Sequence, residues 1–335
     1  METPALRRSL AATLAYFDLF DHPLTLAELL RHRYRFPGET GEAPTAADAL
    51  DALDDPAFGG RDGFWHLAGR DELVAERERR HRLSEKKFAR ARRVARFLRL
   101  LPSVRLAAVC NSLAISGADE ESDIDMFVVA RPGTVWATRF VVASALAALG
   151  LRPDEHTHAD KVCMSFYVAE PEQDLSRFAL APDDTYLRYW TATLVPLYDA
   201  GGAFARFSAA NAWVRERLPG ASAPSARKLR AGAPRWTSPL LPLLRLAEAP
   251  LRRLQTRMFP PDIAAMANKD SRVVVTDGVL KFHVNDRRAE YQALFEAKLR
   301  ELGLDAPTVE KLQAPSSKLE ARSSKLEARS SALEA

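Results

Sequence analysis

Two carboxylates and a small polar pair are the residues in this chain that are best suited to chemistry. Asp123 and Asp125 flank Ile124 at the start of an apolar run, and Asn111 and Ser112 follow an earlier apolar run. Because side chains alternate across a strand, both carboxylates are predicted on one face. Such a pair can bind Mg²⁺ or Mn²⁺, and through it the oxygens of a triphosphate. The turn at the polar pair offers backbone N–H groups and a hydroxyl that can bind the phosphate groups of such a ligand.

The surrounding runs predict an α/β arrangement that positions these residues. Apolar, β-prone runs cover 104–110, 124–130 and 162–169, and a helix is expected over 134–149. Strand, short helix, strand, helix and strand is an alternating pattern, which is typical of an α/β core.

The stretch from Val109 to Val129 resembles the signature of the DNA polymerase β-like nucleotidyltransferase superfamily. That signature is an apolar strand, Gly-Ser or Gly-Gly, about ten residues, and Asp-x-Asp in a second apolar strand. The resemblance implies a metal-dependent NTP site, with Asp123 and Asp125 as catalytic metal ligands and Ser112 as a nucleotide-binding residue. Asn111 stands where glycine is usual, and Asn is the residue that best replaces Gly at positive φ.

A third carboxylate, which such enzymes carry in the following strand to deprotonate the attacking hydroxyl, is missing here. The run 162–168 contains no acid, and Ser165 stands where one is expected. Asp160, just before this run, is the best candidate for the base. If no residue serves as base, the domain binds NTP without rapid turnover, or it depends on substrate positioning.

Four further residues are candidates for contacts to the nucleotide. Lys161 precedes the third strand, and Lys281, His283 and Arg287 cluster on a later hairpin over 272–284. A solvated lysine is the alternative for Lys161, and a structural hairpin with polar ends is the alternative for the others. The Asp-Gly pair between two β-prone runs predicts the hairpin itself.

The chain contains two cysteines, and both lie in apolar runs. Cys110 and Cys163 are therefore predicted to be small buried side chains, with no disulfide and no zinc-ligand spacing.

Residues 1–70 predict a winged-helix-like domain of three helices and a hairpin. In the second helix, over 24–30, Thr25 and Glu28 form a predicted capping box, and Thr45 is placed to cap the third. A winged helix can read DNA or dock proteins. The acidic third helix favours the second role, because its carboxylates would repel phosphates.

A long basic helix is predicted over 71–102. Between Arg70 and Arg105 there are thirteen Lys and Arg residues and five Asp and Glu residues, a net charge of +8. This segment is either a solvated connecting helix or a platform for nucleic acid or another polyanion.

The remaining segments complete an α+β fold class. The nucleotidyltransferase core is assigned to 103–170, a mostly helical C-terminal domain to 171–305, and a disordered repetitive tail to 306–335. Helices are expected over 186–195, 203–218, 240–258 and 287–302. The third of these is expected to be kinked or broken at Pro250. A loop is expected over 219–234.

Composition sets wider limits on the function. No apolar run is long enough for a membrane span and no signal peptide is evident, so a cytoplasmic protein without a membrane partner is expected. The sequence pI of about 9.1 favours an anionic partner. We expect a Mg²⁺- or Mn²⁺-dependent enzyme that transfers an NMP from NTP to a hydroxyl of RNA, protein or a small molecule. The alternative is a catalytically impaired adaptor that senses nucleotide or binds nucleic acid.

Overall fold

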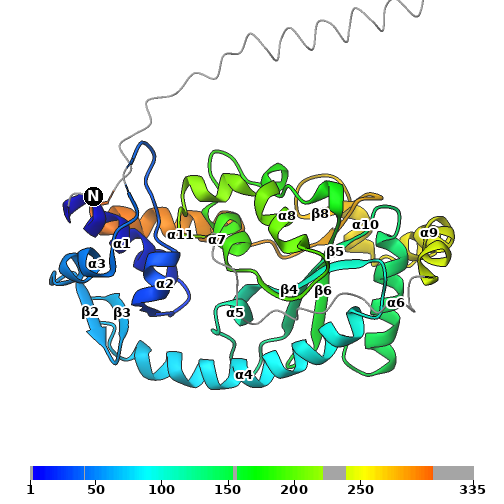
Figure 1. Cartoon of the computed structure of the whole chain (residues 1–335), viewed down its shortest axis with the longest axis horizontal. Coiled ribbons are helices and arrows are strands. Elements are labelled where there is room, and N and C mark those ends of the chain that lie inside the picture. Colours follow the sequence, from blue (N-terminus) through cyan, green and yellow to red (C-terminus); the bar gives the residue numbers. More distant parts are fainter. Residues whose placement is uncertain (1–2, 41, 154–156, 222–238, 305–335) are drawn as a thin grey trace, which may run out of the picture.

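The computed structural model describes residues 3–40, 42–153, 157–221 and 239–304, and its fold is mixed α and β (Figure 1). The helices are α1 (Thr3–Asp18), α2 (Leu26–Arg31), α3 (Ala46–Leu53), α4 (Leu73–Leu98), α5 (Asn111–Ala114), α6 (Val135–Ala148), α7 (Thr185–Thr193), α8 (Ala203–Ala210), α9 (Leu240–Arg257), α10 (Pro261–Met266), α11 (Arg288–Glu301) and the 3₁₀ turns η1 (Glu170–Glu172), η2 (Ser176–Phe178) and η3 (Ala212–Glu216). The strands are β1 (Leu24–Thr25), β2 (Phe58–Arg61), β3 (Phe64–Leu67), β4 (Val104–Val109), β5 (Ile124–Ala130), β6 (Val162–Ala169), β7 (Val195–Asp199), β8 (Val273–Val275) and β9 (Val279–Phe282). The α+β class expected from the sequence is confirmed at this level.

The N-terminal elements form a small unit of three helices and an antiparallel sheet in the order β1-β3-β2. Thr25 begins α2 with the predicted capping box. Its hydroxyl accepts from the Glu28 backbone N–H at 3.3 Å, while the Glu28 carboxylate accepts from the Thr25 N–H at 2.9 Å. Thr45 caps α3 in the same way with Asp48. Both predicted helix starts are confirmed.

This N-terminal unit shares a hydrophobic core with helices from far along the chain. Tyr16 of α1 stacks on Tyr189 of α7 with ring centroids 3.9 Å apart, and Phe295 of α11 packs edge-on against Tyr16. In Figure 1, α11 lies beside α1, and α4 runs along the molecule from the small sheet to the large one. The N-terminal helices therefore pack against α7 and α11.

Within the described residues, the main sheet has six strands in the order β7-β4-β5-β6-β9-β8. Strands β5 and β6 are parallel and the other neighbours are antiparallel. Val128 of β5 faces a core shared with α4 and α6, whereas Phe127 and Val129 face α7 and α8 on the other side. Because both faces are covered, β5 is a continuous apolar run after its first acidic residues.

Three predicted elements differ from the structure. The helix expected over 186–195 ends at Thr193, and the chain then forms edge strand β7, where Pro196 is tolerated. The helix expected over 203–218 divides into α8 and η3 at Asn211, whose side chain donates to the Phe207 carbonyl oxygen. Helix α9 continues through Pro250, so of the two outcomes expected there, a kink or a break, the break does not occur.

Two sequence assignments fall largely on parts of the chain without a description. The tail 306–335 lies outside the described residues, as does most of the loop expected over 219–234. The hairpin expected over 272–284 is confirmed as β8 and β9. In the part of the chain that the structure describes, no helix combines the length and the apolar character needed to cross a bilayer.

Candidate functional site

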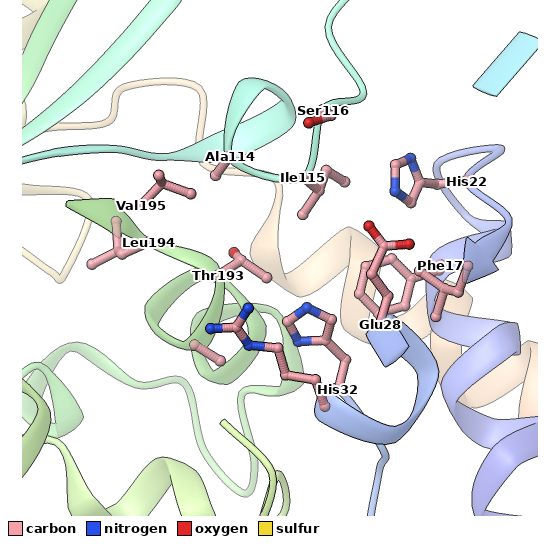
Figure 2. Close-up of a pocket in the computed structure, with 13 residues that line it drawn as sticks. Phe17, His22, Glu28, His32, Ala114, Ile115, Ser116, Thr193, Leu194 and Val195 are labelled. Atoms are coloured by element: carbon pink, nitrogen blue, oxygen red, sulfur yellow. The ribbon is translucent and has the colours of Figure 1, made fainter. Parts of the chain in front are cut away.

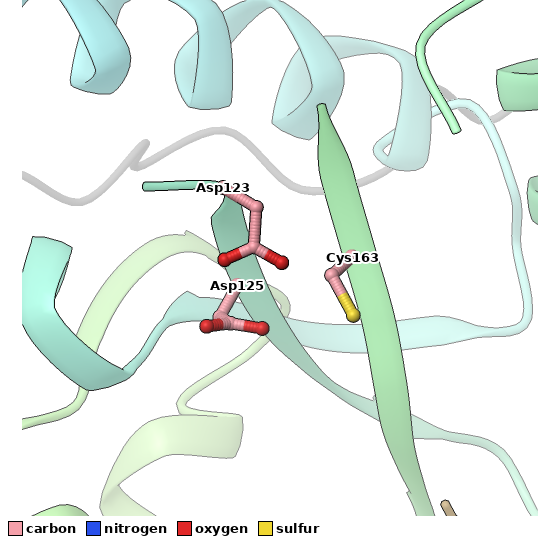
Figure 3. Close-up of side chains that lie close together, drawn as sticks. All are labelled: Asp123, Asp125 and Cys163. Carbon is pink, nitrogen blue, oxygen red and sulfur yellow. The ribbon is translucent and has the colours of Figure 1, made fainter. Parts of the chain in front are cut away.

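The antiparallel pairing of β4 and β5 brings the polar turn next to the carboxylates. Val109 lies opposite Met126, and the backbone N–H of Cys110 donates to the carbonyl oxygen of Asp125 at 3.1 Å. Ile124 and Met126 point into the core and anchor the start of β5. The carboxylates of Asp123 and Asp125 lie close together on one side of the strand, as predicted (Figure 3).

Asn111 adopts the backbone conformation for which its residue type is suited. Its φ is 55°, in the left-handed region that glycine usually occupies. Its side chain is held at both ends, because its Nδ2 donates to Asp125 Oδ2 at 2.6 Å and its Oδ1 accepts from Trp190 Nε1 at 2.8 Å. The replacement of glycine therefore preserves the turn and adds a contact that orients Asp125.

Cys163 lies beside the two carboxylates, and sequence reasoning did not predict this position. It lies opposite Asp125 in the parallel β5–β6 pair, and single ligand atoms of Asp123, Asp125 and Cys163 all lie within 4.8 Å of one another. Among the described residues, this is the only such group of potential metal ligands. The expectation of a fully buried side chain is correct for Cys110 but wrong for Cys163, which is half-buried.

The pairing of β5 with β6 places Cys163, and not Ser165, opposite Asp125. The β5–β6 pairing changes register between Asp125 and Phe127, and Ser165 falls at this irregularity. Ser165 still lines the same cavity. Burial raises the pKa of the Cys163 thiol, and the two neighbouring carboxylates raise it further.

Burial and mutual repulsion disfavour the ionised forms of the Asp123 and Asp125 carboxyl groups. Burial raises the pKa of Asp125 to about 7, and the neighbouring Asp123 carboxylate adds to this effect while the Asn111 amide opposes it. Burial also raises the pKa of Asp123. A bound cation would favour the ionised form of both groups, so the donor set fits a divalent metal ion.

We expect the metal-free chain to lose stability as the pH rises through the titration of Asp125. Between about pH 4 and about pH 7 this side chain is protonated in the folded chain and ionised in the unfolded chain. The unfolded chain then binds fewer protons, so the free energy of unfolding falls with rising pH. Asp125→Asn should flatten this dependence. Urea unfolding at about pH 5 and about pH 8 measures it, and an unchanged pH dependence in the variant would contradict the assignment.

A cavity of about 650 Å³ opens beside the carboxylates, and we call it the carboxylate cavity. This volume lies in the range of small-molecule sites. Asp123, Asp125 and Cys163 form one part of its wall, and the segment from Lys281 to Arg288 forms another. Three of the residues predicted to contact nucleotide, Lys281, His283 and Arg287, therefore line the same cavity as the carboxylates.

The three residues differ in how far they are free to bind a ligand. Lys281 is 1% exposed, and its Nζ donates to the Ser271 carbonyl oxygen at 2.6 Å. Burial lowers the pKa of His283 to about 3, so its ring is neutral near neutral pH. Arg287 is exposed and pairs with Glu290. Arg287 is thus the one of the three whose charged group is exposed at the surface of the cavity.

A buried ion-pair network supports the wall that these residues form. Arg288 donates to Asp184 Oδ2 at 2.8 Å and to the Phe178 carbonyl oxygen at 2.7 Å, and it also pairs with Asp286 at 2.8 Å. The network ties the start of α11 to the start of α7. Sequence reasoning missed Asp184 and Arg288, because only the long-range contact between α7 and α11 brings them together; Asp286 was expected in the cluster with Lys281, His283 and Arg287.

Ser112 lines a second cavity that adjoins the first. This aromatic cavity, of about 430 Å³, is walled by the rings of Tyr16, Phe20, Tyr186, Tyr189, Trp190 and Tyr291. Asn111 and Trp190 line both cavities, so the two spaces meet at the residue that holds Asp125. Ser112 faces the aromatic side of this junction.

Asp160 and Lys161 do not join the carboxylate cavity. Asp160 accepts from Lys87 Nζ at 2.8 Å, and this hydrogen bond lowers its pKa. The same Lys87 Nζ donates to the Ser122 carbonyl oxygen at 2.7 Å, directly before Asp123. Lys161 Nζ donates to the Gly150 carbonyl oxygen at 2.6 Å and lines a separate hollow. Asp160 and Lys87 thus form an ion pair that supports the backbone just before β5.

Several arginine side chains of α4 form ion pairs with acidic residues. Arg77 pairs with Glu28 at 3.0 Å, and Arg79 and Arg80 both pair with Glu76 at 2.7 Å. Further along, Lys86, Arg93 and Arg96 are exposed. The exposed cations of this helix therefore concentrate in its C-terminal half.

A smaller cavity of about 180 Å³ lies on the other side of α5, between the N-terminal unit and the main sheet (Figure 2). His22, Glu28 and His32 face it from the N-terminal unit, and Ile115 and Thr193 face it from the core. Burial lowers the pKa of His32 to about 3 and also lowers that of His22, so both rings are neutral. It is separate from the carboxylates and holds no group of converging metal ligands within the described residues.

Comparison with known proteins gives no match: no protein-family model, no curated protein and no solved structure is significantly similar to this chain.

Proposed function

We propose that this chain is a metal-dependent nucleotidyltransferase of the DNA polymerase β-like type, which transfers an NMP from NTP to a hydroxyl group. One observation carries the proposal. Asp123 and Asp125 lie side by side at the start of β5, directly across the antiparallel β4–β5 pair from a left-handed turn at Asn111. This juxtaposition of paired carboxylates and a tight polar turn is the one that the sequence signature implies.

The arrangement of elements supports the proposal. An antiparallel β4–β5 pair followed by parallel β6 agrees with the core expected from the resemblance. The N-terminal order of helix, strand, two helices and hairpin, with sheet order β1-β3-β2, agrees with a winged helix. We propose that this winged-helix unit docks onto the core, because its first helix packs against α7 and α11.

In the proposed reaction, Mg²⁺ or Mn²⁺ would neutralise the triphosphate and polarise its α-phosphorus. Asp123 and Asp125 would hold the ion, and Asn111 keeps the Asp125 carboxylate in place through its amide. The Ser112 hydroxyl is available to a phosphate oxygen at the junction of the two cavities. Within the described residues that line the carboxylate cavity, β6 offers no carboxylate as base, so positioning of the acceptor hydroxyl carries more of the catalysis.

A second candidate function is a nucleotide-binding adaptor with little turnover. Two observations favour it: β6 presents a thiol and a hydroxyl where the resemblance calls for a carboxylate, and the Asn111 amide occupies one oxygen of Asp125. The exposed cations of α4 would give such an adaptor a surface for nucleic acid.

Label transfer distinguishes the two functions. Purified chain is incubated with each α-labelled NTP and Mg²⁺ or Mn²⁺ in the presence of RNA, a protein lysate or a metabolite pool. We expect label in one pool, and none with the Asp123→Ala/Asp125→Ala double variant. Label that persists in the double variant would refute the site. NTP binding without label in any pool would favour the adaptor.

A further inference from the structure

We infer that Cys163 is a third metal ligand beside Asp123 and Asp125. Compared with a centre made of carboxylates alone, this centre should therefore have a higher affinity for thiophilic divalent ions such as Zn²⁺ or Co²⁺ relative to its affinity for Mg²⁺. The inference rests on the proposed function for the identification of Asp123 and Asp125 as a metal site. It goes beyond that function because it assigns a ligand outside the sequence signature and predicts which metal the centre selects.

The geometry suits one shared ion. Ligand atoms of Asp123, Asp125 and Cys163 lie within 4.8 Å of one another, and all three residues line the carboxylate cavity. Two ligand atoms on one tetrahedral ion are about 3.3–3.8 Å apart, because each bond is about 2.0–2.3 Å long. Side-chain rotations that move the ligand atoms closer by up to about 1.5 Å therefore complete the site. In Figure 3 the sulfur lies on the side of β6 that faces the carboxylates.

The chemistry of the donors sets the preference. Carboxylate oxygens are hard ligands that suit Mg²⁺, whereas a thiolate is a soft ligand that favours Zn²⁺ and Co²⁺. Coordination forms a metal–sulfur bond and releases the thiol proton to solvent. Cys163 takes no part in a disulfide, so its sulfur is available. Three protein donors leave a coordination position open for a substrate oxygen.

The chain also contains its own control. Cys110 is the other of the two cysteines in the chain. It is buried, precedes the Asn111 turn and lies outside the ligand group. Any thiolate–metal signal from the protein must therefore come from one cysteine or the other. Cys110→Ala removes the alternative thiol and leaves the ligand group intact.

Cobalt absorption tests the inference directly. The purified chain is titrated with Co²⁺, and the near-ultraviolet charge-transfer band of a thiolate–cobalt bond is recorded. We expect the band in the native chain and in Cys110→Ala, and its loss in Cys163→Ser. Competition titrations should show that Cys163→Ser weakens Zn²⁺ binding about tenfold or more while Mg²⁺ binding changes less than about threefold.

Absence of the band in the native chain, its loss in Cys110→Ala, or its persistence in Cys163→Ser would overturn the inference. If Cys163→Ser fails to fold, the native chain and Cys110→Ala still decide between the two cysteines. Cys163→Asp should reverse the preference, by strengthening Mg²⁺ binding and weakening that of Zn²⁺. A thiolate band in a chain that transfers no label would leave the inference standing and count against the proposed reaction alone.

Discussion

Asp125→Asn should lower the rate of nucleotidyl transfer by about a thousandfold or more, with little loss of folded protein. The change removes one negative charge from the centre where the metal ion and the triphosphate meet, and stabilisation of developing charge commonly contributes more to catalysis than any other effect. Asn has nearly the same shape as Asp, and it removes the buried acid whose pKa is raised to about 7. Single-turnover transfer of α-labelled NTP to the identified acceptor measures the effect.

Asp160→Asn is the matched control for this prediction. Asp160 lies just before β6, the strand that pairs with β5, and is the best candidate for the base from the sequence, yet its carboxylate pairs with Lys87 and does not line the carboxylate cavity. We expect its transfer rate to fall less than about tenfold, in line with the loss of a partly exposed ion pair. If Asp160→Asn lowered the transfer rate as much as Asp125→Asn does, Asp160 would have a direct role in the reaction. If Asp125→Asn were as active as the native chain, the proposed site would be refuted.

Local sequence signals predicted the elements around the site well. The bounds of β5 and β6 agree with the predicted strands, because two covered faces demand continuous apolar runs and because the preceding turns are polar. The Thr25–Glu28 capping box and the positive φ of Asn111 also follow from residue type alone. Each of these features depends on neighbours within a few residues, which is the information that a single sequence contains.

The features that the sequence failed to predict depend on contacts between distant segments. Strand β7 forms because β4 offers an unpaired edge, although Pro196 and the preceding helical pattern disfavour a strand. Cys163 faces Asp125 because β5 and β6 pair in parallel in one particular register, which the residues of either strand alone do not specify. The grouping of Asp184 with Arg288 requires α7 and α11 to pack, so no local pattern reveals it.

Arg288→Met should destabilise the fold by about 3–5 kcal/mol, the cost of breaking a buried ion pair by removing one partner. Arg288 is 5% exposed, and its guanidinium satisfies the carboxylates of both Asp184 and Asp286, which are also buried. Without it, two carboxylates remain in a region shielded from water. The midpoint of urea unfolding should fall accordingly, and nucleotide binding should weaken because the segment that walls the carboxylate cavity loses its support.

Arg287→Met, one residue earlier, is the control that separates burial from charge. Arg287 is exposed and pairs with Glu290 on the first turn of α11, so its loss should have little effect on the urea midpoint. Replacing Arg288, Asp184 and Asp286 together by Met, Asn and Asn should recover part of the stability, because the Asp184 carboxylate then no longer remains without Arg288, whereas Asp286 has a second partner in Lys281 at 3.6 Å. Equal effects of the two single variants, or no recovery in the triple variant, would show that this network does not support the cavity wall through buried charge.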